Sequence, residues 1–324
     1  MENARPPLDL LIGPTACGKS AVALELARRR RGEILSVDSM KIYKRLEIGV
    51  AKPASEVREA LRHHGIDLQE PWESFSVAEW LQAAERAIAG CAERGTYLLA
   101  EGGTALYIKA LREGLFPGPG RDLALRAELE REATEHGIAR LYARMQEVDP
   151  AAAKKILPND LRRIVRALEV HALTGKPISA QQSQWGHLRE DLCVRVVGLS
   201  LHRMHLYPRI DARVVRMLEA GWLDECRALM DLDCERPLAR EALQALGYLT
   251  LFSHLRGHLT LDEARARIQF DTHHFARRQL SWFRRFADVT WIEIGAEEGV
   301  QAIADRVETA FKRFATETRK HGEG

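Results

Sequence analysis

The stretch that decides the fold is residues 13–20, which read Gly13-Pro14-Thr15-Ala16-Cys17-Gly18-Lys19-Ser20. This run satisfies the pattern G-x-x-x-x-G-K-[ST], and it stands between an apolar run at 8–12 and a helical pattern at 20–31. Such a loop turns backbone N–H groups toward phosphate oxygens, while the lysine neutralises them and the Ser20 hydroxyl can hold Mg²⁺. The stretch predicts a phosphate-binding loop with a magnesium ion. It does not identify the reaction, because ATPases, kinases and transferases all use such loops.

The segments around this loop alternate between strand and helix patterns. We expect further strands at 33–37 and 97–100, and Ser76–Glu79 forms the capping box of a helix between them. Residues 193–199 and 289–294 have the pattern of two more strands. Strands that alternate with helices favour a parallel sheet covered on both faces. We therefore predict an α/β fold: a P-loop NTPase-like parallel sheet covered by helices.

A helical segment interrupts this alternation. Residues 116–120 are too rich in proline and glycine to continue a helix, and only helical patterns follow as far as about residue 184. Asn159 or Asp160 can cap one of these helices, which would run to Leu173. The sequence thus predicts a core at 1–115 and 191–324 and a helical insertion at 116–190. Residues after Lys312 have the composition of a frayed polar tail.

Composition sets only broad limits on function. Lysine and arginine together number 48 against 46 acidic residues, and this balance neither requires nor excludes nucleic acid, because local patches matter more. The five cysteines are scattered without a C-x-x-C, so neither a disulfide framework nor a zinc ribbon is indicated. The chain begins without the apolar core of a signal peptide, and no apolar run approaches the length that spans a bilayer. We expect a cytoplasmic monomer with no membrane partner.

Seven further motifs follow the phosphate loop along the chain. They read Asp38-Ser-Met-Lys-Ile-Tyr43, Ile48-Gly-Val-Ala-Lys-Pro53, His63-His-Gly-Ile-Asp67, Gly102-Gly-Thr-Ala-Leu-Tyr107, Asn159-Asp-Leu-Arg-Arg-Ile-Val-Arg-Ala-Leu-Glu-Val170, Leu246-Gly-Tyr248 and Arg277-Arg-Gln-Leu-Ser-Trp-Phe283. In this order and spacing the set resembles the tRNA dimethylallyltransferases, also called isopentenyl-tRNA transferases, over nearly the whole chain. The resemblance implies that dimethylallyl diphosphate occupies the loop and that its diphosphate leaves. It further implies that the acceptor is N6 of the adenine just 3′ of the anticodon in tRNA.

The resemblance also implies roles for single residues. Asp38 matches a residue that accepts a proton or hydrogen bond from the adenine amine, Thr104 one near the reacting centre, and Arg213 an arginine that steadies the diphosphate. Residues 13–20 would bind the diphosphate. The implied tRNA contacts are Asp38, Ser39, Met40, Lys41, Thr104, Gln244, Gly247 and Tyr248 in the core, and Arg126, Arg162, Arg163, Ile164, Val165 and Arg166 in the insertion.

Some positions depart from the family's usual pattern. They are Val50 in place of threonine, Glu101 in place of an apolar residue, Val215 in place of aspartate, Leu249 in place of a basic residue and His273 in place of arginine. The changes at Leu249 and His273 remove charge from an expected RNA or diphosphate surface. They leave the phosphate loop and Asp38 intact.

Plainer interpretations of the same residues stay open. Asp38 could simply cap the turn after its strand, and the arginines of 162–166 could form a solvated helix face. Residues 28–31 are four arginines at a helix C-terminus, which the helix dipole explains. His63–His64 and His273–His274 are not expected to hold a metal, because adjacent histidines on a helix point in different directions and no carboxylate or cysteine completes a convincing set.

Three rival functions remain. In a P-loop small-molecule kinase, Glu101 would lie on the Mg²⁺ side and Asp38 would activate a hydroxyl. An adenylate isopentenyltransferase would use the same donor with a free nucleotide, and it would not need an arginine-rich insertion. A non-catalytic RNA-binding NTPase would keep the basic face and make Asp38 dispensable.

Overall fold

The computed structural model describes residues 7–116, 118–182 and 186–320, with side chains described as far as Phe314. Pro117 of the predicted proline–glycine break, residues 183–185 in the predicted insertion, and the chain ends at 1–6 and 321–324 lie outside the described residues. The chain forms two compact units, Met1–Arg112 with Arg189–Gly324, and Glu113–Leu188. No helix within the described ranges combines the length and the apolar character needed to cross a membrane.

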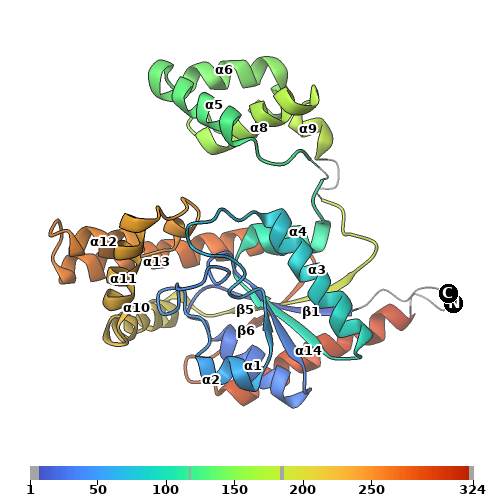
Figure 1. Ribbon diagram of the computed structural model, residues 1–324. Helices are drawn as coiled ribbons and strands as arrows, with labels where there is room; N and C mark the ends of the chain where they lie inside the picture. Colours follow the sequence, from blue (N-terminus) through green and yellow to red (C-terminus); the bar gives the residue numbers. More distant parts are fainter. Residues whose placement is uncertain (1–6, 117, 183–185, 321–324) are drawn as a thin grey trace. The chain divides into compact units, whose positions relative to one another are not determined.

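A parallel six-stranded sheet is the centre of the larger unit (Figure 1). Its strands are β1 Pro7–Ile12, β2 Glu33–Val37, β3 His63–His64, β4 Leu98–Gly102, β5 Cys193–Ser200 and β6 Val289–Glu293. Their order across the sheet is β3-β2-β4-β1-β5-β6, and every neighbouring pair is parallel. This arrangement confirms the predicted α/β class. The sequence analysis missed β3, which is too short for an alternating pattern to be visible.

Register places the ends of three strands side by side. Gly102 of β4 pairs with Ile12 of β1 and with Val37 of β2. The residues that follow these strands are Gly13, Asp38 and Gly103, so they meet at one edge of the sheet. Ligands of open parallel sheets bind at this carboxyl edge, and the alignment therefore directs attention to it.

Helices cover the sheet and extend the larger unit beyond it (Figure 1). They are α1 Lys19–Arg29, α2 Ser55–Ala60, α3 Val77–Glu93, α4 Ala105–Glu113, α10 Arg203–Glu219, α11 Trp222–Glu235, the 3₁₀ turn η1 Ala242–Gln244, α12 Tyr248–Leu255, α13 Leu261–Phe283 and α14 Val300–Lys320. In Figure 1, α1 and α14 lie on one side of the sheet and α3 and α4 on the other.

The predicted polar tail after Lys312 is wrong, because α14 continues to Lys320. Its apolar residues recur at helical spacing, and Ile303, Val307 and Phe311 are buried against α1 and the sheet. The polar residues between them form the solvent face of the same helix. The prediction from composition mistook these polar residues for a frayed tail.

The capping box predicted at the start of α3 is confirmed. Ser76 Oγ accepts the N–H of Glu79 at 3.2 Å, and the Glu79 carboxylate accepts the N–H of Ser76 at 2.8 Å. A cap of this kind stabilises a helix by about 1 kcal/mol. One turn later, the buried Trp80 donates its indole N–H to the Ser36 carbonyl at 3.3 Å and stacks on Tyr107 of α4. These contacts hold α3 and α4 against the end of β2.

The smaller unit is helical, with α5 Leu123–His136, α6 Ile138–Val148, α7 Pro150–Ala153, α8 Leu161–Thr174 and α9 Ile178–Gln181. Leu129, Leu141 and Ile164 are among the residues of its own hydrophobic core. The Asp160 side chain caps α8 by accepting the N–H of Arg163 at 3.3 Å, so the aspartate of the two predicted candidates is the cap.

Candidate active site

The phosphate loop joins β1 to α1 in a conformation that suits anion binding. Ala16 has a φ of 62° and Gly18 a φ of 91°, and both lie in the left-handed region. Gly18 is also the N-cap of α1, and it brings no side chain to cover the first backbone N–H groups of that helix. The Lys19 ammonium lies back across the loop, 3.4 Å from the Pro14 carbonyl. The loop therefore offers N–H groups and a cation to a phosphate.

A cavity of about 890 Å³ opens in front of this loop, and all of its lining residues belong to the larger unit. Polar and charged groups come from the loop and from the ends of β2 and β4, among them Lys19, Ser20, Asp38 and Glu101. The helices α10 to α13 and the loops between them add Arg213 and an apolar wall, which includes Met217, Trp222, Leu246, Ile268, Phe275 and Trp282. The cavity combines an anion site with room for a hydrocarbon group and a base.

Asp38 faces this cavity and also organises its own loop. Its Oδ1 accepts the backbone N–H of Met40 at 2.8 Å and of Lys41 at 3.3 Å. Asp38 therefore does cap the turn after β2. Both of these bonds use Oδ1, and neither uses Oδ2. Arg213 is half-buried near Asp38. Burial lowers the pKa of this arginine, and the negative charge of Asp38 acts in the opposite direction.

Thr104 connects the ends of β2 and β4. Its Oγ1 accepts the N–H of Ser39 at 3.0 Å and lies 3.4 Å from the Ser39 hydroxyl. The backbone N–H groups of Gly103 and Thr104 both approach the Val37 carbonyl at 3.3 Å. Thr104 thus fixes the position of the loop that carries Asp38.

Gln279 of α13 is a site residue that the sequence analysis did not single out. Its Oε1 accepts the N–H of Thr15 at 2.8 Å, and its Nε2 donates to the Gly103 carbonyl at 2.9 Å. A Cβ at position 103 would lie 2.3 Å from that nitrogen, which explains the glycine there. Gln279 lies inside the sequence motif at 277–283, so the motif pointed to this region. The contact with Thr15 could not be predicted, because the two residues are far apart in the sequence.

A buried charged group lies beside the loop at the end of β4. Glu101 has its carboxylate 3.3 Å from Ser20 Oγ and 3.2 Å from Lys41 Nζ, and the side chains of Lys41 and Glu101 are 8% and 5% exposed. Burial raises the pKa of Glu101, but Lys41, Lys19 and the hydrogen bonds together hold it below its usual value. Glu101 is therefore ionised.

A family model described as IPP transferase matches residues 41–286 of the chain. The chain belongs to the IPP transferase family. Among its relatives, the tRNA dimethylallyltransferase of Geobacter metallireducens is 42% identical over 292 residues, which are 90% of this chain and 94% of the relative. The tRNA dimethylallyltransferase of Symbiobacterium thermophilum is 43% identical over 317 residues, 97% and 98% of the two chains.

Solved structures of the family share this fold. The full-length tRNA isopentenylpyrophosphate transferase of Bacillus halodurans matches with a TM-score of 0.68 and 34% identity, over 97% of this chain and 99% of the other. A eukaryotic dimethylallyltransferase, described as acting on tRNA, matches with a TM-score of 0.73 and 25% identity over 89% and 73% of the two chains.

The core residues with family-implied tRNA contacts divide into two groups. Ser39, Met40, Lys41, Gln244 and Gly247 line the cavity with Asp38 and Thr104. Tyr248 instead lies behind the wall, because its side chain is buried and its hydroxyl donates to Glu225 at 2.6 Å.

Glu225 is a second site-supporting residue that sequence reasoning missed. In addition to the Tyr248 hydroxyl, its carboxylate accepts the N–H groups of Glu47 at 3.0 Å and of Ile48 at 2.7 Å. These bonds fix the start of the motif at 48–53, whose Val50 lines the cavity.

The implied tRNA contacts of the insertion also differ in their surroundings. Ile164 and Val165 are buried in the core of the smaller unit, so their side chains pack rather than face solvent. Arg162 and Arg163 are exposed near the start of α8, and Arg163 lies 3.4 Å from Asp160.

Arg126 and Arg166 have a structural task. Arg126 forms two bonds of 2.8 Å with the fully buried carboxylate of Glu169, and Arg166 approaches the same carboxylate at 2.6 Å. Burial raises the pKa of Glu169, but the two arginines reverse this effect and lower it to about 2. Arg126 thereby holds α5 to α8, whereas Arg166 lies on α8 itself and also donates to the Pro119 carbonyl at 3.0 Å.

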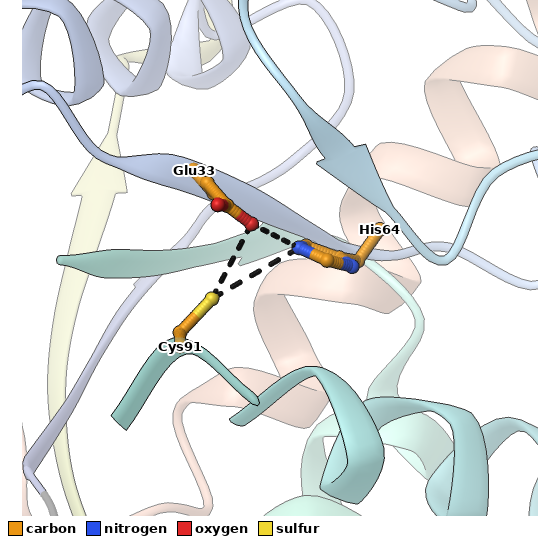
Figure 2. Close-up of side chains that lie close together, drawn as sticks. All are labelled: Glu33, His64 and Cys91. Atoms are coloured by element: carbon orange, nitrogen blue, oxygen red, sulfur yellow. Dashed lines mark hydrogen bonds and ion pairs between the residues drawn. The ribbon is translucent and has the colours of Figure 1, made fainter. Parts of the chain in front are cut away.

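His64 lies in a cluster away from the cavity, with Glu33 of β2 and Cys91 of α3 (Figure 2). Two premises of the sequence analysis are wrong for His63–His64, because these residues form β3 rather than a helix, and a carboxylate and a cysteine do lie beside His64. His64 Nε2 is 2.5 Å from a Glu33 carboxylate oxygen, and Cys91 Sγ is 3.4 Å from the same oxygen. Arg94 binds the other oxygen at 2.8 Å.

The charges around this cluster disfavour a cation. The guanidinium of Arg94 is bonded to Glu33, and that of Arg62 lies 3.9 Å from it. Burial, with the Glu33 charge, raises the pKa of the Cys91 thiol to about 11, so the sulfur keeps its proton. The cluster is a hydrogen-bonded connection between β2, β3 and α3.

Proposed function

We propose that the chain is a tRNA dimethylallyltransferase. It transfers the dimethylallyl group of dimethylallyl diphosphate to N6 of the adenine 3′ of the anticodon in tRNA and releases diphosphate. One observation carries this proposal: the phosphate loop and Asp38 face a single cavity with an apolar wall, in a chain that aligns almost end to end with relatives of that name.

The donor would bind with its diphosphate on the phosphate loop. The allylic carbon ionises readily, so the main catalytic task is to stabilise negative charge on the departing diphosphate. The N–H groups of the loop, Lys19 and Arg213 supply positive charge at this end of the cavity. The apolar wall accommodates the five-carbon group.

A magnesium ion fits the residues at the loop. Mg²⁺ prefers oxygen ligands, and the Ser20 hydroxyl and the ionised Glu101 carboxylate supply oxygens beside each other at the loop. When bound with the diphosphate, the ion would add to the charge stabilisation of the leaving group. Ser20 would hold it.

The acceptor amine would be oriented by Asp38. An exocyclic amino group is a poor nucleophile until its lone pair is freed, and a carboxylate that accepts its proton or a hydrogen bond does this. Thr104 keeps the Asp38 loop in place through Ser39. Because the target adenine is stacked in the anticodon loop, it must turn out of the stack to enter the cavity.

The exposed arginines of the smaller unit would bind RNA phosphates. Arg162 and Arg163 lie near the start of α8 with exposed side chains. We further propose that the enzyme acts as a monomer, in the cytoplasm together with its tRNA substrate.

The experiment that tests the proposal is incubation with labelled dimethylallyl diphosphate, Mg²⁺ and bulk tRNA. We expect label in RNA at the adenine next to the anticodon. Label in free AMP but not in tRNA would identify an adenylate isopentenyltransferase instead. Rapid consumption of ATP without use of the allyl donor would support a kinase, for which the contact between Ser20 and Glu101 is also suited.

A further inference from the structure

Glu101 is a buried carboxylate beside the phosphate loop, and its side chain is 5% exposed. Its position is set by β4, because Glu101 pairs in register with Leu11 of β1, two residues before the loop begins. Its side chain contacts that of Ser20, the second residue of α1. A buried carboxylate has thus been placed against the hydroxyl of the loop.

The contacts of this carboxylate are long. The Ser20 hydroxyl is 3.3 Å from both oxygens, and the Lys41 ammonium is 3.2 Å from one of them. Hydrogen bonds from a hydroxyl or an ammonium to a carboxylate are usually 2.5–2.9 Å, as a general range. An ionised carboxylate that is buried yet only loosely bonded retains the capacity to bind a cation more strongly.

The same contact orients Ser20. A serine hydroxyl has one hydrogen to donate and two lone pairs. It can donate this hydrogen to only one Glu101 oxygen at a time, so its lone pairs and the other carboxylate oxygen remain available to a metal ion. Lys41 lies on the other side of Glu101 and balances its charge, so the pair remains tolerable when no cation is bound.

We propose that Glu101 is part of the magnesium site, binding the ion together with Ser20, and that Lys41 opposes this binding as a competing cation. This inference rests on the magnesium ion of the proposed function. It assigns to Glu101 the role of an acidic residue that binds the metal, and to Lys41 the role of the cation that balances its charge when no metal is bound. Both belong to the described cavity.

The competing explanation is that Glu101 only neutralises Lys41. The two explanations differ in how metal affinity should change when Glu101 or Lys41 is replaced. If the pair is merely structural, loss of either partner leaves the other buried and uncompensated, and both changes disturb the loop in the same direction. If Glu101 binds the metal, its loss weakens metal binding, whereas loss of Lys41 removes a competitor and strengthens it.

The test measures Mn²⁺ binding to the full-length protein in the presence of inorganic diphosphate, followed by the electron paramagnetic resonance signal of free Mn²⁺. We expect Glu101→Gln to weaken binding about tenfold or more, as is usual for loss of a metal-supporting group. Lys41→Met should tighten binding several-fold. The control is Glu297→Gln, an exposed glutamate outside the cavity, which should leave the affinity unchanged.

Unchanged affinity in Glu101→Gln, or equal weakening in both variants, would overturn the inference. If Glu101→Gln fails to fold, Glu101→Asp keeps the charge and shortens its reach; weaker Mn²⁺ binding then supports the inference and unchanged binding overturns it. Failure of the proposed function can be distinguished from failure of this inference. Wild-type protein that binds no Mn²⁺ with diphosphate would remove the magnesium site altogether, whereas label transfer to tRNA with an unaffected Glu101→Gln would remove only the role of Glu101.

Discussion

Gln279 accepts a hydrogen bond from the backbone N–H of Thr15 at 2.8 Å, although 264 positions separate the two residues. The other end of the same amide donates to the Gly103 carbonyl. Helix α13 is therefore attached at one point both to the phosphate loop and to the end of β4. Any ligand that moves the loop must also act on this helix, which contributes Phe275 and Trp282 to the cavity wall.

The first prediction concerns this connection. Gln279→Glu keeps an acceptor for Thr15 but removes the donor to Gly103, and it adds negative charge beside the phosphate loop. We expect the KM for dimethylallyl diphosphate to rise about tenfold, the equivalent of one lost hydrogen bond plus repulsion of the diphosphate. Steady-state kinetics at varied donor concentration checks this. An unchanged donor KM would mean that the bridge does not position the loop.

The second prediction concerns Asp38. Asp38→Asn should lower kcat by about two to four orders of magnitude, as expected for a lost general base. The amide oxygen can still accept the N–H groups of Met40 and Lys41, so the loop should keep its shape and tRNA affinity should change little. Single-turnover transfer and a tRNA binding assay measure the two effects separately. Near-normal turnover would remove Asp38 from the mechanism.

The features predicted correctly from sequence are those whose causes are local. The strand, loop and helix at residues 7–29 follow from one contiguous run, and the capping box of α3 needs only Ser76 and Glu79, three residues apart. Gln279 and Glu225 could not be found in this way, because each acts on backbone groups more than 170 positions away. The motif at 277–283 includes Gln279, but the motif does not show which groups this side chain binds.

The errors in the prediction also have physical causes. The end of α14 was taken for a tail because polar residues outnumber the apolar stripe of Phe311 and its neighbours. The two-residue strand β3 depends on pairing with β2, which no local pattern encodes. In the insertion, arginine spacing along α8 suggested one common role, but burial of Glu169 on the same helix divides the arginines into two sets.

The third prediction is a pH dependence from Glu169. Its pKa in the folded chain is about 2, below the usual 4.5. Because the folded pKa is depressed, the carboxylate stabilises the fold above its unfolded pKa, and this contribution is lost as the pH falls from about 5 toward about 2. We expect the amides of α5 and α8 to lose protection against hydrogen exchange in this window, after correction for intrinsic rates.

Helix α1 of the larger unit provides the internal reference for that measurement. Protection of α5 and α8 should fall more steeply than that of α1, and Glu169→Gln should remove the difference in slope while lowering protection at neutral pH. Parallel loss of protection in all three helices would show that the Glu169 cluster does not control the acid response.

The last prediction tests how the smaller unit meets RNA, and the structure decides which arginines can test it. Arg126→Ala or Arg166→Ala removes one of the two arginines that compensate the buried Glu169, and this loss destabilises the smaller unit. Loss of tRNA binding in either variant would therefore not distinguish RNA contact from unfolding. Arg162 and Arg163 are exposed, and their replacement should leave the unit folded.

An Arg162→Ala/Arg163→Ala variant should bind tRNA more weakly and flatten the salt dependence of binding by about one unit of slope for each arginine. Its affinity for dimethylallyl diphosphate should stay unchanged, because the described donor cavity lies wholly within the larger unit. Binding titrations over a range of salt concentrations measure the slope, and circular dichroism with thermal unfolding verifies the fold. If tRNA affinity and slope both stay the same, this face is merely solvated, and a free nucleotide becomes the better candidate for the acceptor.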